Sequence, residues 1–176
     1  MSKILSTQMS GLFQRIIQSE EEAIEETARL LAQASVGQGN VYFACFGELQ
    51  PIEIKALEKT EPFANLSKWT PDTPITDADR VCIFTASCED QEALNLAKEL
   101  YEEFIPFAVV APEQQSDNNE LSNLAYTYVS TKVRGGILPH PVKLGERIVI
   151  PHLMAALFIY EAIKLNYDEI IFDDEL

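Results

Sequence analysis

The segment RVCIFTASCEDQE, residues 80–92, has the pattern of a buried strand that leads directly into a helix. In α/β proteins such a junction often holds a phosphate, because the free backbone amides at a helix start attract anions. Thr85 and Ser87 offer hydroxyl donors here, whereas Glu89 and Asp90 place two acids beside them. The segment therefore leaves two alternatives: an anion site, or a helix start that supplies its own anions.

The structural alternative explains most of this junction as a helix cap. Ser87 is then the N-cap of a helix over 88–104, and Asp90 takes the N3 position of a capping box. In the functional alternative, the same amides and the hydroxyls of Thr85 and Ser87 hold a phosphate while the acids turn to solvent. Cys88 is not interpreted as a nucleophile, because the adjacent acids oppose the lowering of a thiol pKa at a helix start.

Helices and strands alternate along the rest of the chain. Apolar residues at three-and-four spacing predict one long amphipathic helix over 6–36, which ends at Gly37 and Gly39. Continuous apolar runs, typical of strands buried on both faces, predict a parallel sheet. The expected strands are 41–46, 81–86, 107–111 and 126–129. We therefore expect an α/β fold, a three-layer α/β/α sandwich with a long N-terminal helix.

The expected organisation is a single domain with three parts. They are the N-terminal helix (1–37), the α/β core (40–165) and an acidic tail (166–176). One short strand is expected within 63–69, and an apolar helix over 150–165 closes the core. The tail contains one strand-like run.

Composition narrows the class of protein. The chain has 176 residues, 47% of them hydrophobic, and a net charge of −15, so neither nucleic acid nor an anionic membrane is an expected partner. No apolar run reaches the roughly 18 residues of a membrane span, and the N-terminus lacks a signal core. Cys45, Cys82 and Cys88 show no metal-ligand spacing, and reduced thiols fit a cytoplasmic protein.

Positive charge is concentrated in one segment. Residues 130–152 carry both histidines and have a net charge of +3, which leaves −18 for the remainder. The single acid is Glu146, and the cations are Lys132, Arg134, Lys143 and Arg147. Either this basic segment pairs with acidic neighbours on the surface, or it forms a local anion site. A small phosphorylated ligand fits the second alternative better than a polymer does.

The order of these segments resembles the sugar isomerase (SIS) family, within it the phosphoheptose isomerase-like branch, and most closely an uncharacterised bacterial group. The clearest match is DRVCIFTASCEDQEALNLAKELYEEFIPFAVVAPE, which resembles the family's strand, Ser-x-Ser-Gly loop, helix and next strand. GNVYFACFG resembles its first strand and glycine turn, and PHLMAALFIYEAI its closing helix. The resemblance covers residues 5–165 in organisation and is motif-level over 85–110.

The resemblance implies a flavodoxin-like sheet, oligomerisation through the N-terminal helices, and a sugar phosphate as ligand. Thr85 and Ser87 stand at the two serine positions and would bind phosphate, with Cys88 in the same substrate-binding loop. Gly47 would line the sugar pocket. His152 would be the acid/base, since an imidazole pKa of about 6.5 suits proton transfer; the alternative is a helix-start residue that caps or packs.

Several residues depart from the family pattern. Cys88 replaces the loop glycine, and Asp90 stands where a further hydroxyl is common. Glu48 and Leu49 replace small or hydroxyl residues of the first turn. Phosphate affinity is therefore expected to be weaker, or shifted toward the basic segment 130–152.

Two functions stay open. In a phosphosugar aldose–ketose isomerase, Glu48, or Glu53 or Glu58 in the next helix, would remove a proton beside the carbonyl, and His152 would shuttle it. The alternative is a non-catalytic SIS-type module that binds a sugar phosphate and signals to, or assembles with, another protein. A nucleotide-binding protein is disfavoured by the absence of Gly-x-Gly-x-x-Gly and Walker patterns. We expect no cofactor, and a homodimer or higher homo-oligomer.

Overall fold

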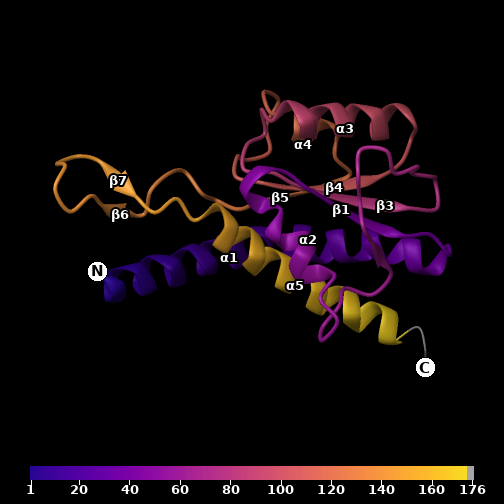
Figure 1. Cartoon of the computed structure of the whole chain (residues 1–176), viewed down its shortest axis with the longest axis horizontal. Coiled ribbons are helices and arrows are strands. Elements are labelled where there is room, and N and C mark those ends of the chain that lie inside the picture. Colours follow the sequence, from indigo (N-terminus) through magenta and orange to yellow (C-terminus); the bar gives the residue numbers. More distant parts are fainter. Residues whose placement is uncertain (174–176) are drawn as a thin grey trace.

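The computed structural model describes residues 1–173 and has a five-stranded sheet between two layers of helices (Figure 1). The strand order is β2-β1-β3-β4-β5, and every neighbouring pair is parallel. The strands are β1 (Val41–Cys45), β2 (Leu66–Ser67), β3 (Arg80–Phe84), β4 (Phe107–Ala111) and β5 (Thr127–Ser130). The predicted α/β fold and its parallel sheet are confirmed, with strand ends within two residues of those expected.

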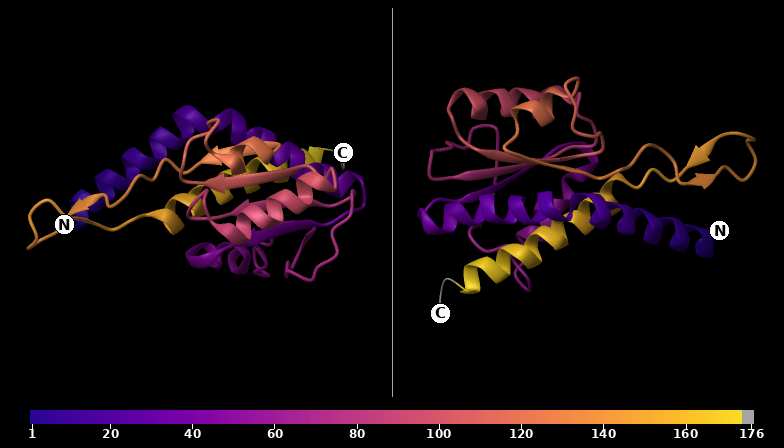
Figure 2. Two further views of the ribbon diagram at one scale, coloured as in Figure 1. Left: turned by 90° about the horizontal axis from the view of Figure 1, so that it is seen from above. Right: turned by 180° about the vertical axis from the view of Figure 1, so that it is seen from behind.

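Both faces of the sheet are covered, which explains why its strands are continuous apolar runs. One face carries α1 (Ser2–Val36), α2 (Pro51–Ala56) and α5 (His152–Asp173). The other carries α3 (Gln91–Glu102) and α4 (Glu120–Leu124) (Figures 1 and 2). Along β1, Val41 and Phe43 pack toward α1 and α5, whereas Tyr42 and Ala44 pack toward α3.

The two longest helices, α1 and α5, lie on the same face of the sheet (Figure 1). The predicted long helix is confirmed as α1, which crosses α5 at an angle (Figure 2), with the rings of Phe13 and Phe158 stacked 4.3 Å apart. Within residues 1–173, no helix is long and apolar enough to cross a membrane.

The chain end differs from the prediction. A helix ending at 165 and a strand-like acidic tail were expected, but α5 continues to Asp173. The reason is Tyr167, which is fully buried and continues the apolar stripe of the helix. Its hydroxyl donates to the carbonyl of Ala64 at 2.9 Å. Residues 174–176 of the expected tail lie outside the described residues.

The basic segment forms an arm that was not predicted. The short strands β6 (Leu138–Pro139) and β7 (Arg147–Ile148) pair antiparallel and project beyond the layers beside the N-terminal half of α1 (Figures 1 and 2). We call residues 137–149 the hairpin arm. At its base, a Cβ on Gly136 would lie 2.7 Å from the backbone of Arg147 and Ile148, so only glycine permits this close approach.

Candidate functional site

Two turns meet where the strand order reverses. β1 is followed in sequence by β2 on one side of it and then by β3 on the other, and ligands bind parallel sheets at such a switch point, beyond the carboxyl ends of the strands. The turn after β1 holds Gly47 and Glu48; the turn after β3 spans 85–90. The N–H of Phe46 donates to the carbonyl of Phe84 at 3.0 Å, so the two turns are neighbours.

The turn after β3 is already filled by groups of the protein itself. The N–H of Cys88 donates to the carboxylate of Glu113, just beyond the end of β4, at 2.9 Å. The N–H of Glu89 donates to the Ser87 hydroxyl oxygen at 3.1 Å, and the Thr85 hydroxyl donates to the Ser87 carbonyl at 3.0 Å. The groups predicted to hold a phosphate therefore have internal partners here.

The capping residue is Asp90 and not Ser87. The helix begins at Gln91, and Asp90 Oδ1 accepts from the N–H of Glu92 and of Ala93 at 3.0 and 3.1 Å. The predicted capping box with Ser87 as N-cap is wrong, and the predicted helix began three residues early. Asp is among the preferred N-cap residues, and its negative charge is favourable at the positive end of the helix dipole. This helix start supplies its own anions.

Cys88 is a protonated thiol in this turn. Burial, followed by the nearby carboxylate of Glu113, raises the pKa of Cys88 to about 11. The thiolate is the reactive form of cysteine. Cys88 is therefore a weak nucleophile at neutral pH.

The three candidate acids lie in the connection between β1 and β2. Glu48 is exposed in the 3-10 turn η1 (Gly47–Leu49). Glu53 is half-buried in α2 and accepts from the N–H of Trp69 at 3.2 Å. Glu58 is exposed, and a hydrogen bond from the backbone N–H of Thr60 lowers its pKa. Glu53 lies in the helix after β1, as predicted, whereas Glu58 follows the end of that helix at Ala56.

His152 lies on the helix that contacts both η1 and α2. It is the first residue of α5, and its Nδ1 is buried without a hydrogen-bond partner among residues 1–173. No hydrogen bond joins it to Glu48, Glu53 or Glu58 in that part of the chain. The other histidine, His140, accepts from two backbone N–H groups of the hairpin arm.

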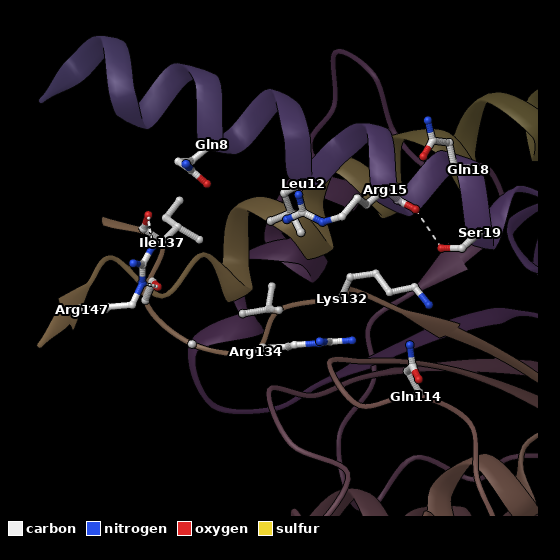
Figure 3. Close-up of a pocket in the computed structure, with 13 residues that line it drawn as sticks. Gln8, Leu12, Arg15, Gln18, Ser19, Gln114, Lys132, Arg134, Ile137 and Arg147 are labelled. Atoms are coloured by element: carbon white, nitrogen blue, oxygen red, sulfur yellow. Dashed lines mark hydrogen bonds between the residues drawn. The ribbon is translucent and has the colours of Figure 1, made fainter. Parts of the chain in front are cut away.

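A cavity of about 760 Å³ lies between the N-terminal half of α1 and the segment that follows β5 (Figure 3). None of its lining residues is acidic. Glutamine amides and apolar side chains complete the wall around four cations. The cations are Arg15, Lys132, Arg134 and Arg147.

Two of these cations are fixed by the protein. Lys132 Nζ lies 2.6 Å from the carboxylate of Glu20, whose other oxygen accepts from the N–H of Ser130 at 3.0 Å. The Arg147 guanidinium donates to the carbonyls of Gly136 and Ile137, each at 2.8 Å. Glu20 therefore neutralises Lys132, whereas Arg147 keeps its full charge.

The other two cations are available to a ligand. Arg15 projects from α1 and Arg134 from the segment after β5 (Figure 3). Both are exposed, and neither side chain makes a hydrogen bond or ion pair within residues 1–173. Arg134 also lines a neighbouring cavity of about 470 Å³ together with Cys88 and Glu113, so the cation-lined cavity adjoins the turn after β3.

Sequence reasoning found part of this cavity. It singled out Lys132, Arg134 and Arg147 as members of the basic segment, but not Arg15. Arg15 lies on the exposed side of a long helix, where a lone arginine carries no signal of a distant partner. Of the predicted site residues, Gly47, Glu48, Thr85, Ser87, Cys88 and His152, none lines this cavity.

Relatives match nearly the whole chain. Residues 1–171 match the family described as "Domain of unknown function (DUF2529)". The "Uncharacterized protein YwjG" of Bacillus subtilis (strain 168) is 34% identical over 172 residues, which are 97% of this chain and 98% of that protein.

Solved structures of low sequence identity share the fold. A proposed phosphosugar isomerase involved in capsule formation, from Bacteroides fragilis NCTC 9343, superposes with a TM-score of 0.73 at 13% identity over 96% of this chain and 88% of that one. The NanR protein of Vibrio vulnificus, solved in complex with ManNAc-6P, has a TM-score of 0.64 and 12% sequence identity. The match covers 96% of this chain and 63% of that one. Phosphoheptose isomerase GmhA from Neisseria gonorrhoeae has a TM-score of 0.62 and 13% sequence identity, and the match covers 91% of this chain and 93% of that one. These similarities confirm the sugar isomerase fold.

Proposed function

We propose, since the chain belongs to the DUF2529 family and has the sugar isomerase fold, that it binds a sugar phosphate as a non-catalytic SIS-type module. The observation that carries this proposal is the cation-lined, acid-free cavity between α1 and the segment after β5. Because the chain has a net charge of −15, most of its surface repels anions, whereas the cations of this cavity attract them.

The side chains of the cavity suit a phosphorylated sugar. Arg15 and Arg134 each present a planar fork of N–H donors, which can hold phosphate oxygens in pairs. Gln8 and Gln114 line the same cavity and offer amide donors and acceptors for sugar hydroxyls. The fold neighbour solved with ManNAc-6P supports this class of ligand.

The turn after β3 is less suited to hold the phosphate. A phosphate there would displace Glu113 from the N–H of Cys88 and approach the carboxylate of Asp90. Like charges at close range repel, and the repulsion is large where water is excluded. We propose that Thr85 and Ser87 keep the shape of this turn, and that Cys88 lies at the margin of the ligand site.

An isomerase is the second candidate, favoured by one observation. The buried Nδ1 of His152 has no hydrogen-bond partner within residues 1–173. Leaving such a group unsatisfied costs about 1–3 kcal/mol of stability, and a catalytic role is one reason why a protein keeps it. In that case His152 would shuttle a proton that Glu48 removes from a sugar in the phosphoheptose isomerase-like manner. General acid–base catalysis of this kind contributes roughly 10² to 10⁴ in rate.

Assembly belongs to the same proposal. The N-terminal end of α1 projects beyond the sheet (Figure 1) and exposes Met1 and Ile4. We propose that α1 joins copies of the chain into a homodimer or a larger homo-oligomer, and that the protein acts in the cytoplasm.

Isothermal titration calorimetry with pentose, hexose and heptose phosphates tests the binding proposal. Arg15→Gln and Arg134→Gln should each weaken binding about tenfold, because one hydrogen bond to a charged group contributes about 1.5–3 kcal/mol. Arg29→Gln is the matched control, since Arg29 is an exposed α1 arginine paired with Glu25 outside the cavity. The proposal fails if no sugar phosphate binds, or if the control weakens binding as much.

The same ligands, incubated with the protein in heavy water and followed by NMR, separate the two candidates. A binding module leaves the proton next to the sugar carbonyl in place. An isomerase exchanges it for deuterium, and His152→Asn then slows this exchange while sparing affinity.

A further inference from the structure

We infer that the cavity takes a sugar with two separated anionic groups, a phosphate near Arg15 and Arg134 and a second phosphate or a carboxylate near Arg147. This inference rests on the proposed function and specifies its ligand. It follows from the charge, arrangement and size of the cavity.

The charge of the cavity exceeds what one phosphate neutralises. Lys132 is paired with Glu20, which leaves Arg15, Arg134 and Arg147 without a counter-charge in the lining. Arg147 is held by two carbonyls, which orient its guanidinium but do not cancel its charge. A phosphate monoester carries about −1.5 to −2 at pH 7, so one phosphate leaves part of the charge of three arginines unbalanced, and this charge favours a second anionic group.

The arrangement of the cations separates the two groups. Figure 3 shows Arg147 beside Ile137 near one end of the cavity, whereas Arg15 reaches in from α1 and Arg134 lies on the facing wall. Leu12 and Ile137 contribute apolar wall, against which a sugar ring can lie. A single phosphate near Arg15 and Arg134 would leave Arg147 unpaired.

The position of Arg147 is built into the fold. Its two hydrogen bonds, to the carbonyls of Gly136 and Ile137, join β7 to the first part of the arm. Gly136 allows this approach, because a Cβ there would lie 2.7 Å from the backbone of Arg147. The guanidinium is therefore held in place before a ligand arrives, which lowers the entropic cost of binding.

The volume also favours a ligand with two anionic groups. Ligand pockets span roughly 300–1,000 Å³, and this cavity of about 760 Å³ lies in the upper part of that range. A sugar ring with one phosphate leaves part of it to water, whereas a second anionic group reaches the Arg147 end.

Matched ligand pairs test the inference by calorimetry. Fructose 6-phosphate is compared with fructose 1,6-bisphosphate, ribose 5-phosphate with ribulose 1,5-bisphosphate, and glucose 6-phosphate with 6-phosphogluconate. In at least one pair, the ligand with two anionic groups should bind about tenfold more tightly, the effect of one charge-assisted contact. The third pair shows whether the second group can be a carboxylate.

Substitution of Arg147 locates the second group. Arg147→Gln should bring the two affinities of each pair within about twofold, and Arg147→Lys should restore part of the preference. An unfolding midpoint equal to that of the natural protein excludes a collapse of the structure in Arg147→Gln. Lys143→Gln is the control, because Lys143 lies on the arm, pairs with Glu146 and does not line the cavity.

Two results overturn the inference and leave the proposed function standing. One is equal binding within every pair by the natural protein; the other is a preference that survives Arg147→Gln. The absence of binding by all six compounds instead contradicts the proposed function, and the inference falls with it.

Discussion

Glu113 and Asp90 decide what the turn after β3 can bind. Glu113 accepts from the N–H of Cys88, and Asp90 accepts from two N–H groups of the first turn of α3. These three amides are the kind of donor that a phosphate would use at a helix start. Two carboxylates of the chain occupy them instead, so the anion site known from such junctions is satisfied internally.

Replacing Asp90 and Ser87 one at a time tests the assignment of Asp90 as the N-cap of α3. Asp90→Ala should lower the free energy of unfolding by about 1 kcal/mol, the usual effect of losing an N-cap. Ser87→Ala should cost less, because its hydroxyl accepts one amide outside the helix. Urea unfolding of the three proteins measures the difference, and a greater loss in Ser87→Ala would contradict the assignment.

The buried carboxylate of Asp79 makes stability depend on pH. Asp79 is 4% exposed and accepts from the N–H groups of Asn40 and Thr76, each at 2.8 Å. Burial alone would raise the pKa of Asp79, but these hydrogen bonds outweigh it and lower the pKa. The stabilisation is therefore present above the unfolded pKa of about 3.9 and is lost as pH falls through the lower folded value.

Asp79→Asn should remove this dependence. The amide keeps the shape but loses one acceptor, so stability at pH 7 should fall by about 1–3 kcal/mol. The difference in urea midpoint between pH 7 and pH 3 should narrow relative to the natural protein. An unchanged difference would show that Asp79 is not the group that titrates.

At the scale of elements, sequence patterns located the sheet and missed features set by distant contacts. The strands were predictable because both faces are buried, which leaves continuous apolar runs such as Val41–Cys45. The end of α5 was not, because Tyr167 becomes core only through contact with the loop at Ala64. The hairpin arm was missed because strands of two residues carry no periodicity.

The candidate site was predictable to a similar extent. The basic segment gave three of the four cations by charge alone. The fourth, Arg15, requires knowing that α1 lies against the segment after β5. That the amides of the turn after β3 bind carboxylates of the chain could be predicted in part, because Asp90 lies in the same segment of sequence. The contact with Glu113 could not be predicted, because Glu113 follows the next strand.

Two glycines in and after α1 have opposite roles. Gly39 lies so close to the next loop that a Cβ would be 1.9 Å from the carbonyl oxygen of Ala78. Gly39→Ala should therefore cost about 1–3 kcal/mol of stability through overpacking.

Gly11 is inside the helix, and a Cβ there meets only Arg15 at 3.5 Å, so Gly11→Ala should stabilise the protein by about 0.5–1 kcal/mol. Thermal unfolding checks both, and a loss in Gly11→Ala would contradict the open space assigned to it.

At the scale of the whole molecule, charge and shape set the expected partners. A net charge of −15 surrounds one cation-lined cavity, which concentrates small anions there. The same charge opposes close association of two copies, so an assembly must bury apolar surface to overcome it. The projecting end of α1 offers such surface.

Light scattering at micromolar concentration tests the assembly. We expect a mass of at least twice the 19.7 kDa of one chain. Ile4→Glu, on the projecting end of α1, should lower that mass, whereas Ile54→Glu, at an exposed position of α2, should not. A monomer for the natural protein would contradict assembly through α1.

The central claim is that a sugar phosphate binds in the cation-lined cavity and not in the turn after β3. Titration of the ¹⁵N-labelled protein with ribose 5-phosphate, followed by amide chemical shifts, tests it most directly. We predict that the largest shifts arise at the backbone amides of 133–137, while those of Cys88 and Glu89 stay bonded to Glu113 and Ser87 and change little. The largest shifts at Cys88 and Glu89, with 133–137 unmoved, would contradict the claim, as would no shift at saturating ligand.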